Sequence, residues 1–201
     1  MDRIINEFHD LNRNPLSNCG ITVGIENEND YSLWKLTILG PKDTSYKAWM
    51  FFLGAKFPED YPLKPPEVYF TTPIYHLNVN PRAPKSPEDI PLGHISISTL
   101  SWWKPEYKMR EVLINIYALF YKANPDSPYG LARAEEFRDN RAMYEEKIKH
   151  FTKKYAAPMK AGKQYSRTED WDFSIEYDSK WKNIFKILYA LYKPYIVVFF
   201  I

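Results

Sequence analysis

The segment "FFLGAKFPEDYPLKPPEVYF", residues 51–70, decides how this chain folds. An apolar run at 50–57 gives way to a stretch stiffened by four prolines, and a second apolar run begins at residue 67. Because proline is excluded from helix interiors and central strands, this stretch predicts two strands joined by extended chain. Two strands in succession without a helix between them favour antiparallel pairing.

Hydrophobic patterning on both sides of this segment predicts the remaining elements. Apolar residues at helical spacing begin the chain, strand-like runs separated by a Gly/Pro/Asp turn follow, and helical spacing returns after residue 108. The expected helices are 2–12, 109–122, 130–138 and 140–156, and the expected strands are 20–26, 33–39, 50–57 and 67–70. Four consecutive strands flanked by helices indicate an α+β fold with one antiparallel meander sheet.

Composition narrows the classes of function. The chain has 201 residues, a net charge of +2 and a pI of 8.4, which is less basic than a dedicated nucleic-acid binder usually is. The single cysteine, Cys19, excludes an internal disulfide and indicates a reducing compartment, and we expect it to be a small buried residue. No Cys/His cluster has the spacing of a zinc site, so neither a metal nor a cofactor is expected. The first residues lack the apolar core of a signal peptide, so we expect an intracellular protein.

The C-terminal segment differs in character from the rest. We expect a domain at 1–158, a polar linker or arm at 159–180 and a hydrophobic helical tail at 181–201. The tail places Trp181, Phe185, Leu188 and Tyr192 on one face of a helix as candidate partner-binding residues.

Three locations for this tail remain open. The closing "YIVVFFI" has no charge, but Lys193 and Pro194 interrupt the apolar run that a spanning helix would need. The tail could span a membrane, lie on one as a basic amphipathic helix, or dock in a large protein assembly. We expect membrane association, with the endoplasmic reticulum and the mitochondrion both open, rather than a free cytosolic protein. A segment folded back on its own domain is the less favoured structural alternative.

The order of elements coincides with a set of motifs. These are "RIINEFHDL" (3–11), "LWKLTILGPKDTSY" (33–46), "FFLGAKFPEDYPLKPPEVYFTTPIYHLNVN" (51–80), "GHISISTLSWWKPEYKMREVLINIYALF" (93–120) and "NPDSP" (124–128). Together, over roughly residues 2–156, they resemble the ubiquitin-conjugating enzyme (E2) family. The resemblance implies the UBC fold and a role in the conjugation pathway of ubiquitin or a similar protein.

The family's chemistry maps onto three positions of this chain. A cysteine receives ubiquitin as a thioester, an asparagine stabilises the oxyanion, and an acid beyond the next helix orients the incoming lysine. By the motifs, the cysteine position is Ser96, the asparagine is Asn78 and the acid is replaced by Ser127. Ser98 and Leu77 also depart from the family pattern.

Three interpretations of Ser96 remain open. The chain is an inactive, scaffold-like variant, or it is an active enzyme represented by a Cys-to-Ser form, or Ser96 is itself a nucleophile with His94 as base. The inactive variant explains the other departures together and is favoured. Without a thiolate, Asn78 and His76 are expected to brace the adjoining loop through hydrogen bonds.

The resemblance also implies partner surfaces. Members meet the activating enzyme through basic residues of the first helix, where Arg3 remains, and they meet ligases through positions matched by Leu63 and Pro105. Here these residues are candidate contacts in a multi-subunit assembly, and contact with ubiquitin or a similar modifier stays open. No nucleic-acid partner is expected.

Overall fold

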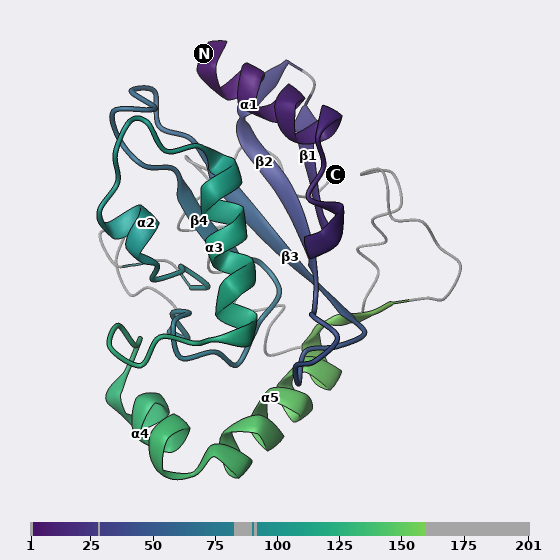
Figure 1. The fold of residues 1–201 in the computed structure, drawn as a ribbon, viewed down its shortest axis with the longest axis vertical. Coiled ribbons are helices and arrows are strands. Elements are labelled where there is room, and N and C mark those ends of the chain that lie inside the picture. Colours follow the sequence, from purple (N-terminus) through teal and green to yellow (C-terminus); the bar gives the residue numbers. More distant parts are fainter. Residues whose placement is uncertain (1, 28, 83–89, 91, 160–201) are drawn as a thin grey trace.

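The helices and strands follow the predicted order in the computed structural model, which describes residues 2–27, 29–82, 90 and 92–159 (Figure 1). The helices are α1 Asp2–Arg13, α2 Ser98–Ser101, α3 Met109–Tyr121, α4 Leu131–Asp139 and α5 Arg141–Tyr155, with a 3-10 turn η1 at Ser17–Cys19. The strands are β1 Ile21–Asn27, β2 Asp30–Leu39, β3 Trp49–Lys56, β4 Glu67–Phe70 and β5 Ala157–Pro158. The α+β prediction is therefore confirmed, while the linker from residue 160 and the tail lie outside the described residues.

The sheet is an antiparallel meander. Its order is β1-β2-β3-β4, and the short β5 pairs with the start of β3 at Trp49 and Met50. Each pairing joins consecutive strands, as expected when no helix intervenes. The sequence did not predict β5 or α2, since two and four residues are too short to show a period.

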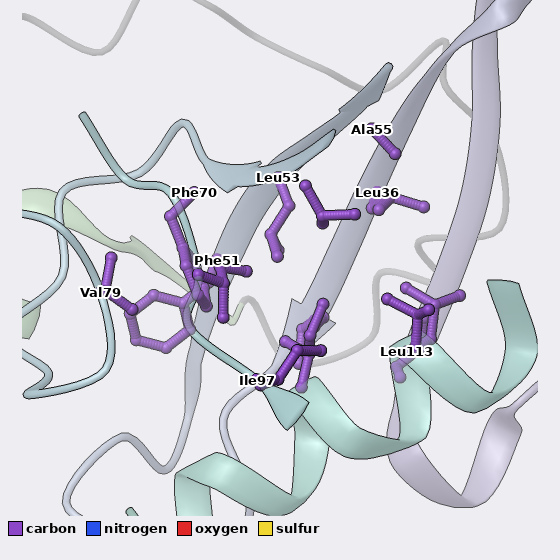
Figure 2. Packing of buried hydrophobic residues seen from close by; sticks show 14 of the residues in the cluster. Leu36, Phe51, Leu53, Ala55, Phe70, Val79, Ile97 and Leu113 are labelled. Carbon is purple, nitrogen blue, oxygen red and sulfur yellow. The ribbon is translucent and has the colours of Figure 1, made fainter. Parts of the chain in front are cut away.

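The hydrophobic core lies between the sheet and α3. Figure 1 shows α3 running across one face of the sheet, with α1 at one end of the molecule and α4 and α5 at the other. Leu36 and Leu53 of the sheet and Leu113 of α3 project into this core, each at most 2% exposed (Figure 2). Ile97, at the end of the segment that contains Ser96, joins the same cluster. The core thus fixes the backbone beside the candidate site.

Candidate functional site

The segment that contains Ser96 is held between β4 and the His76–Asn80 segment. Isolated bridges join His94 to Tyr69 and Ile95 to Val79. The turn before it needs a glycine, because Gly93 has a φ of +81° and a Cβ there would lie 2.1 Å from the carbonyl oxygen of Phe70. The position of residue 96 is therefore set by backbone contacts on both sides.

Ser96 is turned outward by the alternation of its neighbours. Ile95 and Ile97 are buried, whereas Ser96 is half-buried. Its N–H donates to the carbonyl oxygen of Asn78 at 2.9 Å, and its Oγ lies 2.7 Å from the Oγ of Ser127. The structure thus brings together two of the predicted positions, 96 and 127, as a pair of hydroxyls. Ser98, the third serine of this run, is exposed at the start of α2.

Asn78 is fully buried and bound to the loop that contains Ser127. Its Nδ2 donates to the carbonyl oxygens of Asn124 at 2.7 Å and Ser127 at 2.9 Å, and its Oδ1 accepts from the N–H of Asn124 at 2.8 Å. Both N–H bonds of the amide are occupied, so the expected bracing of the loop is confirmed. In this arrangement the amide has no donor left for a ligand at residue 96.

His76 is a neutral structural residue. Its Nδ1 accepts from the N–H of Asn78 at 3.0 Å, and its Nε2, 3.0 Å from the carbonyl oxygen of Leu119, is the nitrogen left to carry the proton. Burial lowers the pKa of His76 to about 4, because a charged imidazole would lose its hydration there. The imidazole therefore joins the site to α3 as an uncharged group, in agreement with its predicted bracing role.

His94 has an orienting partner that the sequence did not reveal. Its Nδ1 lies 2.6 Å from the Oη of Tyr129, which is 35 residues away along the chain. His94 and Tyr129 line, with Ser96, a pocket of about 270 Å³. Within the described residues, however, the Ser96 hydroxyl pairs with Ser127 and makes no hydrogen bond to His94. Burial also lowers the pKa of His94, which makes this imidazole a weaker base.

Arg3, predicted to meet a partner, is engaged inside the domain. Its guanidinium pairs with Glu7 and donates to the carbonyl oxygens of Pro105 at 3.5 Å and Tyr107 at 3.1 Å. Two-thirds of its side chain is covered, with 34% exposed. Arg3 therefore fastens α1 to the loop before α3, a structural role that is separate from any partner contact.

Glu7 is the centre of that junction and was missed by the sequence analysis. Its side chain is 7% exposed, and its carboxylate accepts from the Oη of Tyr61 at 2.9 Å and the N–H of Met109 at 2.6 Å. Met109 is the first residue of α3, so the carboxylate satisfies a free N–H at the positive end of this helix. Nothing in the sequence distinguishes Glu7 from Asp2 and Asp10, the other acids of α1.

Leu63 and Pro105 are exposed and belong to loops that contact each other. The Nε1 of Trp103 donates to the carbonyl oxygen of Pro62 at 2.7 Å, which joins the two loops. Leu63 is 73% exposed, and Trp102, which the sequence analysis did not select, is 78% exposed. Two large apolar side chains are thus available on joined loops near α1.

Cys19 is less buried than the sequence predicts. Cys19 is half-buried rather than buried, because it lies in the surface turn η1 and only its inner side packs on the core. In the described ranges there is no cluster of metal-binding side chains and no helix long and apolar enough to cross a bilayer. Trp181, Phe185, Leu188 and Tyr192 lie outside the described residues.

Comparison with known families agrees with the fold. A family model described as ubiquitin-conjugating enzyme matches residues 3–152, which is well over half of the chain. The match covers α1 except for its first residue, strands β1 to β4, the Ser96 segment and most of α5. The chain therefore belongs to the ubiquitin-conjugating enzyme family.

Proposed function

We propose that this protein is a catalytically inactive member of its family, which serves as a binding scaffold or accessory subunit of a larger assembly. The observation that supports the proposal is the hydroxyl at position 96, where the family's chemistry requires a thiolate. A serine hydroxyl is a weak nucleophile unless a base accepts its proton. Here the hydroxyl faces Ser127 instead of a base.

Two further features of the site favour loss of chemistry. Both N–H bonds of the Asn78 amide are used within the protein, so an oxyanion at residue 96 would need a rearrangement of the loop. Residues 98 and 127 are serines where acids are frequent in the family, so no carboxylate at these positions would hold an incoming lysine. Each feature alone is compatible with activity, and their combination favours a scaffold.

A specific observation supports a second candidate, an active conjugating enzyme represented by a Cys-to-Ser form. The asparagine, the buried histidine and the loop that contains Ser127 are all assembled around residue 96. If only the sulfur were missing, the same frame would receive a cysteine without change. A cysteine at position 96 therefore distinguishes the two candidates experimentally.

The test is the charging of the Ser96→Cys variant. The variant and the wild type are each incubated with activating enzyme, ATP and ubiquitin, and resolved with and without a reducing agent. The scaffold proposal predicts no adduct for either chain. An alkali-labile ester on the wild type would contradict the proposal directly. A reducible adduct on the variant would show that only the sulfur is missing and would favour the second candidate. An active family member run in parallel checks the reagents, and the circular dichroism spectrum checks that the variant is folded.

The assembly is proposed to be membrane-associated through residues 181–201. The support is the sequence "YIVVFFI", which would be prone to aggregation in water unless it were covered. Alkaline extraction of membranes from cells that express the full chain tests how it is held. Retention in the membrane pellet is expected for a spanning tail, and complete release would exclude a spanning tail but not a peripheral one.

A further inference from the structure

The charges of this chain are distributed very unevenly. Residues 147–163 contain six lysines and no acid, whereas the rest of the chain contains 21 basic and 25 acidic residues. The chain as a whole is +2, so this short segment is +6 and the remainder is −4. Such a separation creates a field that can orient the molecule near a charged surface.

The described part of this segment is the second half of α5. Tyr144, Ile148 and Thr152 form the buried side of the helix. The opposite side exposes what we call the α5 basic face, which consists of Lys147, Lys149, His150, Lys153 and Lys154. Because buried and exposed residues alternate with the helical period, these cations share one broad face. The sequence continues with Lys160 and Lys163, beyond the described residues.

One lysine at the N-terminal end of this face is paired with an acid of α4. Glu136 pairs with Lys147 at 2.7 Å, and Glu145 pairs with Arg141 at the other end of the helix at 2.7 Å. Glu146 is exposed beside the face and is the last acid of α5. From residue 147 to the end of α5 the charge is therefore of one sign.

Exposed apolar side chains flank these cations. Met143 is 49% exposed and Met159 is 48% exposed, at either end of the basic stretch. Flexible apolar groups beside lysines suit the boundary between headgroups and acyl chains. A polybasic segment joined to an apolar tail provides the two signals that stable membrane attachment needs.

We propose that the α5 basic face docks on an anionic lipid surface and thereby orients the domain. The inference rests on the proposed membrane link of the tail and adds a second contact from the folded domain. The lipid is recognised by its charge, as with phosphatidylserine or phosphatidylinositol headgroups. A lipid partner is favoured over a nucleic acid because the same chain contains the uncharged apolar segment 195–201, which a nucleic-acid surface would leave exposed.

The orientation has a structural consequence. Figure 1 shows α5 and α1 at opposite ends of the molecule, and Arg3 ties the Pro105 loop to the α1 end. With α5 against the membrane, α1 and the loops of Leu63 and Trp102 point toward the aqueous side. Repulsion between the anionic surface and the net negative remainder of the chain favours the same orientation.

The experiment measures how the full chain binds vesicles by flotation. Vesicles of phosphatidylcholine with 30% phosphatidylserine, about the proportion that gives an anionic leaflet its surface potential, are compared with pure phosphatidylcholine. The test variant is Lys149→Gln/Lys153→Gln, and the matched control is Lys64→Gln/Lys104→Gln, which removes the same charge from exposed loops outside α5. Since each lysine near an anionic surface contributes roughly fivefold, the test variant should bind the anionic vesicles about 25-fold more weakly. The control should bind them like wild type.

Three other outcomes would contradict the role of the α5 basic face, and each points to a different explanation. If the α5 variant binds the anionic vesicles like wild type and Lys182→Gln/Lys186→Gln does not, the tail alone makes the contact. The same conclusion follows if wild type binds both vesicle types equally. In both cases the proposed membrane link of the tail stands and the role of α5 is wrong. If wild type binds neither vesicle, the membrane link fails as well. If wild type prefers a duplex oligonucleotide to vesicles and the α5 variant loses this binding, the face is a nucleic-acid surface.

Discussion

The buried polar residues that brace the domain, which we call the frame, differ from the two reactive positions in burial and in hydrogen bonding. Asn78, His76 and Glu7 are buried, and each is hydrogen-bonded to backbone groups of another segment. Ser96 and Ser127 are half-buried or exposed, and their hydroxyls bond to each other. The frame is thus tied to the backbone, whereas the two hydroxyls are tied only to each other.

The difference shows which residues of the site are needed for the stability of the fold. Removing a frame residue leaves buried N–H or C=O groups without partners, at roughly 1–3 kcal/mol for each group. Changing an exposed hydroxyl usually changes the free energy of unfolding by no more than about 0.5 kcal/mol. Substitutions at the reactive positions are therefore expected to leave the fold intact, whereas substitutions in the frame are expected to destabilise it.

The largest effect is expected for Glu7→Ala. The substitution leaves the N–H of Met109 and the Oη of Tyr61 without their acceptor, and Arg3 without its counter-charge. We expect the free energy of unfolding, measured in urea, to fall by about 4 kcal/mol. Glu106→Ala, at an exposed acid, is the matched control and should change it by less than about 0.5 kcal/mol. A loss below about 1 kcal/mol for Glu7→Ala would show that the junction is not part of the frame.

The next effect is a dependence of stability on pH through His76. Its pKa is about 4 when folded and its ordinary value is 6.5, so between these values the unfolded chain binds more protons. Stability from this group is complete above pH 6.5 and is lost as the pH falls toward 4, by about 3 kcal/mol.

Comparing unfolding curves of wild type and His76→Gln over this range isolates the contribution, because glutamine does not titrate. The His150→Gln control, at an exposed histidine, should keep the full dependence. If the free energy of unfolding depended on pH in the same way for wild type and His76→Gln, His76 would not be buried as a neutral group.

A smaller effect is expected beside the reactive position. Tyr129→Phe removes the hydroxyl that lies 2.6 Å from His94, in a partly buried pair. We expect a loss of about 1 kcal/mol in the free energy of unfolding. Tyr121→Phe removes an exposed hydroxyl and should be neutral. If Tyr129→Phe also left the free energy of unfolding unchanged, the pair of His94 and Tyr129 would not contribute to stability and would not be part of the frame.

The fold could be predicted from the sequence to within a few residues at most element ends. The helical spacing at 2–12 and 109–122 and the apolar runs at 20–26 and 50–57 each correspond to an observed element. These patterns are local, because burial of one face imposes its period on the sequence. The bracing role of Asn78 could also be anticipated, because an asparagine side chain can bind the backbone of an adjoining loop.

Contacts between distant residues could not be predicted. His94 meets Tyr129 across 35 residues, and Glu7 meets Met109 across 102, without a sequence signal for either pair. Trp102 is an aromatic residue that composition would place inside, yet it is exposed because Trp103 takes the inward position. Such features depend on how loops distant in the sequence pack together, and no local sequence pattern reports that packing.

The measurement that tests the central claim most directly compares Asn78→Ala with Ser96→Ala in one set of urea unfolding experiments. Asn78→Ala removes three hydrogen bonds between a buried side chain and loop backbone and should lower the free energy of unfolding by about 2 kcal/mol. Ser96→Ala removes one hydroxyl contact at the surface and should change it by less than about 0.5 kcal/mol. Equal losses, or a larger loss for Ser96→Ala, would contradict the separation of a structural frame from a dispensable reactive position.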